Sequence, residues 1–163
     1  MKNIETATKA ALQRAEDYRQ AAALIPTMNK VVKEFDGKVY NCRLDKALKA
    51  ATNNRLHVEK RYSTIAIYAY PQNNYSHTIT IADMNLEDMP DGKRIVAGKF
   101  KQSSNEYRAQ LLRKAYEIET ATETMPQSMA YIEESVSKIN KFLNGIPMEL
   151  RGIYNIPCCV RTY

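Results

Sequence analysis

The sequence has no tryptophan, only three cysteines, five glycines and six prolines among its 163 residues. Two of the cysteines, Cys158 and Cys159, are adjacent and the number is odd, so we expect no disulfide framework and a reducing cytoplasm. No apolar stretch approaches the roughly 20 residues that span a bilayer. Met1–Arg19 also lacks the apolar core of a secretory signal. We therefore expect a soluble, cytoplasmic protein with no membrane partner.

The composition is otherwise that of a folded protein, with 44% hydrophobic and 26% charged residues. The net charge is +6, which favours anionic partners such as nucleic acid, although many cytosolic proteins carry such a charge without one. The basic residues are concentrated in two segments of the chain. Residues 36–62 hold seven basic and three acidic residues, and residues 93–114 hold seven basic and one acidic.

Apolar residues at helical spacing predict long amphipathic helices in both halves of the chain. They are expected over residues 4–25, 28–35 and 44–51, from 103 onwards, and from 126 to 144. Pro26 should interrupt the first helix, because proline lacks an N–H and clashes with the preceding turn. Ser103 and Glu106 form a capping box that marks the start of the fourth helix, and Pro126 marks the start of the fifth.

A change of period from 3.6 to 2 predicts a small antiparallel sheet of two to four strands. Strands are expected at residues 56–58, 65–70 and 77–82, with weaker candidates at 38–41 and 94–97, a turn at 71–76 and an acidic loop at 83–92. The apolar parity switches between Val58 and Ile65, so a bulge or break should lie at residues 60–63. The apolar tail, residues 148–163, should pack back onto the body. The expected fold is α+β, with long amphipathic helices packed on a small antiparallel sheet, in a single domain spanning residues 1–163.

Local motifs for catalysis or metal binding are missing. His57 and Glu59 form H-x-E, and Cys158-Cys159 follow about a hundred residues later. This pattern is weakly similar to the zinc-site motifs of zinc deaminases. Adjacent cysteines cannot reproduce the geometry of the two-residue spacer in those enzymes. The loop from Asp83 lacks the glycine and the closing glutamate of a calcium loop. We predict no catalytic residue, no metal and no cofactor. An enzyme without a local motif ranks third, after a binding protein and an oligomeric interaction module.

The tyrosines around the predicted hairpin are the strongest indication of function. If Ile65 and Ile67 face the core, the even positions from Lys60 to Tyr70 face away from it. Tyrosines and a lysine on an open sheet face could stack bases and hold phosphates. Alternatively, a helix covers this face and the tyrosines belong to the edge of the core. The candidate binding residues here are Lys60, Arg61, Tyr62, Tyr68 and Tyr70.

A basic run between the sheet and the fourth helix is the second candidate. Its residues are Lys93, Arg94, Lys99, Lys101, Arg108, Arg113 and Lys114. The side chains from Lys93 to Lys101 are expected in an irregular segment, from which they could reach a phosphate backbone. The alternative is a solvated surface that keeps the protein in solution.

Residues 33–48, KEFDGKVYNCRLDKAL, resemble short segments of small accessory proteins of bacterial phages and mobile elements. The resemblance implies a bacterial cytoplasm and a small protein that acts by binding, including inhibitors of host defence complexes that target nucleic acid. The leading hypothesis is a non-enzymatic binding protein that contacts nucleic acid or a nucleoprotein complex. The alternative is an oligomeric or structural interaction module, so a protein partner and a homodimer stay open.

Overall fold

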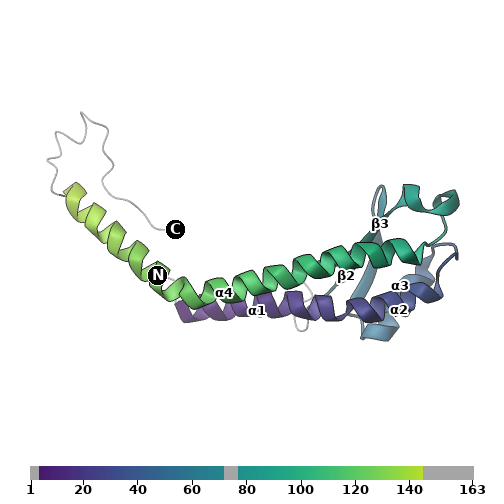
Figure 1. Ribbon diagram of the computed structural model, residues 1–163, viewed down its shortest axis with the longest axis horizontal. Coiled ribbons are helices and arrows are strands. Elements are labelled where there is room, and N and C mark those ends of the chain that lie inside the picture. The colour runs from purple at the N-terminus through teal and green to yellow at the C-terminus, as the bar shows by residue number, and fades with distance from the viewer. Residues whose placement is uncertain (1–3, 72–76, 145–163) are drawn as a thin grey trace, which may run out of the picture. The chain divides into compact units, whose positions relative to one another are not determined.

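The computed structural model describes residues 4–71 and 77–144. In chain order its elements are α1 (Ile4–Ala23), α2 (Ile25–Glu34), α3 (Cys42–Thr52), β1 (Leu56–Lys60), β2 (Thr64–Ala69), β3 (Ile79–Asn85), the 3-10 turns η1 (Leu86–Asp88) and η2 (Pro90–Gly92), and α4 (Ala97–Asn144). The predicted α+β class is confirmed: helices pack on one small antiparallel sheet (Figure 1). The predicted tail, residues 148–163, and most of the predicted turn at 71–76 lie outside the described residues.

The chain divides into two compact units. One unit, Lys9–Glu119, holds the sheet, the shorter helices and the first part of α4. The other unit joins Met1–Thr8 to Thr120–Tyr163, and its described residues are helical. That all 163 residues form a single domain therefore stays a prediction.

The first two helices follow the sequence pattern closely. The predicted interruption lies at Leu24, so that Pro26 is the second residue of α2. Proline is tolerated there because the first helical N–H groups have no partner within the helix. Within the unit Lys9–Glu119, α1 and α2 run antiparallel to the first part of α4. Arg19 pairs with Glu119 and Asn29 with Ser104, so one residue number rises as the other falls.

The sheet is a meander in the order β1-β2-β3. β1 and β2 form a hairpin in which Val58 lies opposite Ile67, and β3 pairs with β2 on its other side. The predicted break between the first two strands is confirmed, as a tight turn at residues 61–63. A bulge in the β2–β3 pairing leaves Ile81 without an opposite residue.

One face of the sheet and the helices enclose the hydrophobic core. Its largest fully buried side chains include Phe100, Met28, Leu44, Leu56 and Ile67. Alternation along β1 and β2 places these strand residues on one face, as period 2 predicts. Each helix contributes apolar residues at three-four spacing, because only one side of each helix meets the sheet.

Two weakly predicted strands are reduced to a single bridge. Val39 pairs with Arg94, and Tyr40 N and Ile95 N donate to the backbone oxygens of Lys93 and Lys38 at 2.8 and 2.9 Å. The chain then turns directly into α4.

The start of α4 differs from the prediction. The helix begins at Ala97 and not at Ser103, because a residue distant in sequence supplies the cap. Asp36 Oδ1 accepts a hydrogen bond from Ala97 N at 2.9 Å. Lys99 and Lys101 are therefore helical and do not lie in an irregular segment.

The predicted division of the last helix at Pro126 is wrong. α4 continues through this residue as one element of 48 residues. A proline removes one backbone hydrogen bond from a helix but does not always end it. The predicted acidic loop is also shorter than expected, because β3 extends through Asp83 to Asn85.

Candidate nucleic-acid interface

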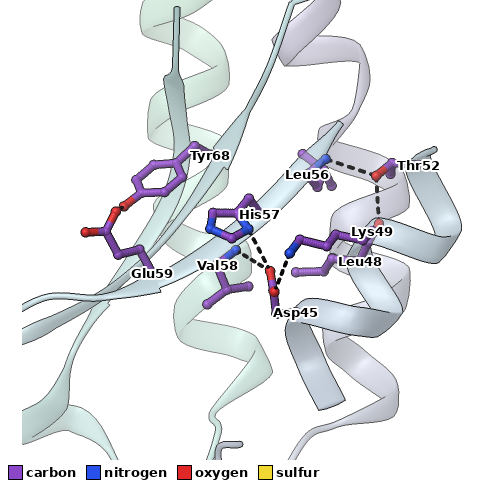
Figure 2. A network of polar contacts seen from close by, with 9 residues as sticks. All are labelled: Asp45, Leu48, Lys49, Thr52, Leu56, His57, Val58, Glu59 and Tyr68. Atoms are coloured by element: carbon purple, nitrogen blue, oxygen red, sulfur yellow. Dashed lines mark hydrogen bonds and ion pairs between the residues drawn. The ribbon is translucent and has the colours of Figure 1, made fainter. Parts of the chain in front are cut away.

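Tyr68 is not on an open face. It lies opposite the core but is only 3% exposed. His57 stacks on its ring at 6.1 Å and the Arg61 guanidinium lies 5.2 Å from the ring centre. Its hydroxyl donates to Glu59 (Figure 2). The same hydroxyl accepts a hydrogen bond from Arg61 at 3.3 Å. The predicted stacking role of Tyr68 is therefore corrected, because its ring is covered by neighbours from its own hairpin.

Lys60 does not share a face with Tyr68. It lies opposite Ile65 in the β1–β2 pairing, and directly opposite residues project to the same side. The turn at residues 61–63 resets the alternation, so one parity cannot be carried across it. Tyr70 is half-buried and its ring lies 6.4 Å from that of His57.

Tyr62 is the exception among the hairpin tyrosines. It lies at the tip of the β1–β2 turn and is fully exposed, at 106% of the reference area. The neighbouring Lys60 and Arg61 are exposed as well. The first candidate surface is thus reduced to a protruding turn, Lys60–Arg61–Tyr62, which we call the hairpin tip.

α3 closes the free edge of β1 with two side chains (Figure 2). Thr52 Oγ1 accepts from Leu56 N at 3.0 Å and donates to Leu48 O at 2.6 Å. Asp45 Oδ1 accepts from Val58 N at 2.9 Å. These side chains occupy backbone groups that an edge strand would otherwise offer to another chain.

The Asp45 carboxylate also lies next to two basic side chains. Lys49 Nζ lies 2.9 Å from its carboxylate and His57 Nδ1 lies 3.0 Å away. Burial raises the pKa of Asp45, but the hydrogen bond from Val58 N and the charges of Lys49 and His57 outweigh it, so the pKa lies below 3.8. Both residues of the H-x-E motif therefore have partners within the fold. His57 pairs with Asp45, and Glu59 accepts a hydrogen bond from Tyr68. Among the described residues no group of three or more histidine, cysteine or acidic side chains could hold a metal.

α4 closes the free edge of β3 in a similar way. Ser103 Oγ accepts from Asp83 N at 2.9 Å and donates to Asp83 Oδ1 at 3.0 Å. Tyr107 donates its hydroxyl to Asp83 Oδ2 at 2.7 Å. Burial and this hydrogen bond raise the pKa of Tyr107 to about 12. Ser103 therefore has a structural role in place of the predicted helix cap.

The second candidate surface is built around the Val39–Arg94 bridge. Backbone hydrogen bonds hold residues 38–40 against residues 93–95 and so bring Lys38, Lys93 and Arg94 together, all exposed. Val39 lies among them and is 50% exposed. We call Lys38, Val39, Lys93 and Arg94 the bridge patch.

Two of its basic side chains are held by local contacts. Arg94 Nη1 donates to Gly37 O at 3.0 Å, and Lys38 Nζ lies 5.5 Å from the centre of the Phe35 ring. Arg94 also lies 4.0 Å from Asp91, but both side chains are more than half exposed, so this pair is weak. The patch therefore presents exposed positive charge, two of whose side chains are held by local contacts.

The basic residues of α4 do not form one surface. Lys101 and Arg108 are seven residues, or about two turns, apart and lie on the same side of the helix. Arg113 is five residues from Arg108, so it lies on a different side. Lys114 lies 5.7 Å from the centre of the Tyr18 ring. All of these side chains are exposed, as is that of Lys99, but they are spread around the helix.

The sequence pattern missed Lys38 and Val39 as partners of Lys93 and Arg94. They are separated by more than fifty residues, and the only local signal was the weak strand pattern of residues 38–41. That segment lies within residues 33–48, which carry the resemblance described above.

Comparison with known proteins found no matching family model, no similar curated protein and no similar solved structure. Within residues 4–71 and 77–144, no helix combines the length and the apolar character that crossing a membrane requires.

Proposed function

We propose that this chain is a non-enzymatic binding protein that contacts the phosphate backbone of nucleic acid, free or in a nucleoprotein complex, through the bridge patch. The observation that carries the proposal is that the bridge brings three exposed basic residues, Lys38, Lys93 and Arg94, close together in the fold. Lysine and arginine side chains displace counterions from phosphates, which gives affinity without sequence readout. The net charge of +6 would steer the protein towards such a partner.

The cellular setting that we propose rests on the segment that contributes Lys38 and Val39 to the bridge patch. Residues 38–40 belong to the stretch that resembles accessory proteins of phages and mobile elements. A nucleoprotein complex of a host defence system is therefore the form of target that we propose first, in a bacterial cytoplasm.

The direct test measures binding of labelled single- and double-stranded nucleic acid by fluorescence anisotropy over a range of salt concentrations. We expect Lys38→Ala/Lys93→Ala/Arg94→Ala to reduce the slope of log K against log salt by about 2–3, because each lost phosphate contact removes about 0.7–0.9. The control is Lys9→Ala/Lys30→Ala/Lys46→Ala, which removes the same charge from exposed sites on three helices.

The control separates a local contact from net charge. If the two triple variants lose the same affinity and slope, the bridge patch is not the binding surface. If the unmodified protein binds no nucleic acid at low salt, direct contact is wrong and a protein partner remains.

A protein partner is the second candidate function, and the exposed Val39 favours it. An exposed apolar residue with a basic bridge partner and a basic chain neighbour suits an acidic protein surface with an apolar centre. Val39→Ser should leave nucleic-acid affinity within about twofold, since phosphates make no apolar contact. The same change should weaken a protein complex, so the two candidates are distinguishable.

A further inference from the structure

The hairpin tip offers an aromatic ring that the fold does not use. The Tyr62 side chain makes no hydrogen bond, ion pair or ring contact with any residue in the described ranges 4–71 and 77–144. The other tyrosines of the hairpin are stacked or half-buried. A large aromatic side chain left wholly in water gains nothing for folding, so a contact outside the chain is its natural use.

Backbone hydrogen bonds hold the turn that carries this ring. Arg61 and Thr64 exchange hydrogen bonds of 2.7 and 3.3 Å across the turn, and Leu86 N donates to Ser63 O at 2.8 Å. The turn is therefore tied both to its own strands and to the segment that follows β3. A ring on a fixed turn loses little conformational entropy when it binds.

The charges beside the ring favour a nucleic acid. Lys60 has no carboxylate partner among the described residues and Arg61 lies over Tyr68, so neither neighbouring cation covers the Tyr62 ring. Glu87 and Asp88 also lie close to the turn, because the Leu86–Ser63 hydrogen bond brings η1 beside it. A duplex is wide and keeps its bases stacked inside, so it would bring phosphates towards these carboxylates. A single strand can present one unstacked base to Tyr62 and its adjacent phosphates to the neighbouring cations.

We propose that the hairpin tip makes the protein a binder of single-stranded nucleic acid, with Tyr62 stacking on an unpaired base and Lys60 and Arg61 contacting the adjacent phosphates. This inference rests on the proposed function, since the bridge patch supplies the phosphate affinity that the tip directs towards unpaired strands.

The test compares a short labelled single strand with its duplex, using the full chain at low salt. Tyr62→Ala should weaken single-strand binding by roughly fivefold or more, the loss typical of one base–aromatic stack, and leave duplex binding within twofold. Tyr62→Phe keeps the ring and should restore single-strand affinity. Tyr116→Ala is the matched control, because Tyr116 is a 65% exposed tyrosine on α4.

The outcomes separate this inference from the proposed function. Unchanged single-strand affinity in Tyr62→Ala, while the bridge-patch variant binds more weakly, overturns the stacking role, keeps the proposed function and leaves Tyr62 to a protein contact. Equal losses for single strand and duplex overturn the preference for unpaired bases. No binding by the unmodified protein overturns both. A melting temperature equal to that of the unmodified protein confirms that each variant is folded.

Discussion

Replacing Thr52 by valine should destabilise the protein strongly for so small a change. Threonine and valine have nearly the same shape, but valine cannot accept the hydrogen bond from Leu56 N. Thr52 and Leu56 are both buried, so water cannot replace this acceptor. A buried N–H without a partner costs about 1–3 kcal/mol. The carbonyl of Leu48 keeps its helical hydrogen bond, and the added methyl group recovers part of the loss. We expect a net loss of about 1–2 kcal/mol, or about 2–8 °C in melting temperature.

Thermal and urea unfolding of the full chain measure this loss. Thr124→Val is the control, since the Thr124 hydroxyl also bonds to a carbonyl of its own helix but is exposed and accepts from no strand. Its effect should stay within about 0.5 kcal/mol. Thr52→Ser, which keeps the hydroxyl, should recover hydrogen-exchange protection at the Leu56 amide. Equal stability of Thr52→Val and Thr124→Val would show that the edge of β1 does not depend on this side chain.

Three further predictions concern single side chains. Asp45→Asn should destabilise the protein at neutral pH. The stability difference from the unmodified protein should shrink as pH falls below 3.8, because a lowered pKa gives stability that is lost on protonation. A stability difference that does not depend on pH in urea unfolding would contradict this. Tyr107 should lose its proton near pH 12, and this step should be missing from the ultraviolet titration of Tyr107→Phe. The stability difference between Tyr107→Phe and the unmodified protein should fade between pH 10 and 12, because the raised pKa stabilises the fold only while the phenol is protonated. Phe100→Ala should cost about 3–5 kcal/mol in calorimetry, since the ring is fully buried, and a loss below about 1 kcal/mol would place it outside the core.

Features that depend on neighbouring residues could be read from the sequence. The amphipathic spacing predicted α1, α2 and α3 within a few residues, and Asn53 ends α3 in the left-handed region with φ of 55°. The parity switch between Val58 and Ile65 predicted the break that became the hairpin turn. Each of these signals is contained in a few adjacent residues.

Features that depend on distant residues could not be read in this way. The capping box at Ser103 fits its pattern, but Asp36 caps the helix earlier, and Ser103 instead bonds to β3. Lys38 and Lys93 meet only because a backbone bridge joins two segments far apart in sequence. Whether the Tyr68 ring is open or covered could not be read either, since the His57 and Arg61 side chains that contact it come from other parts of the hairpin.

The sheet itself has little surface left for a partner. One face is core, and Tyr68 on the other face is covered by side chains of the hairpin. Asp45 and Thr52 bond to the edge of β1, and Ser103 bonds to the edge of β3, so addition of a foreign strand would first have to break these contacts. Around the sheet, in the part of the chain that the structure describes, the hairpin tip and the bridge patch are the surfaces that we propose for a partner. Stability and binding should accordingly be separable: substitutions at the tip and the patch should change affinity while the melting temperature stays constant, and those at the strand edges should do the reverse.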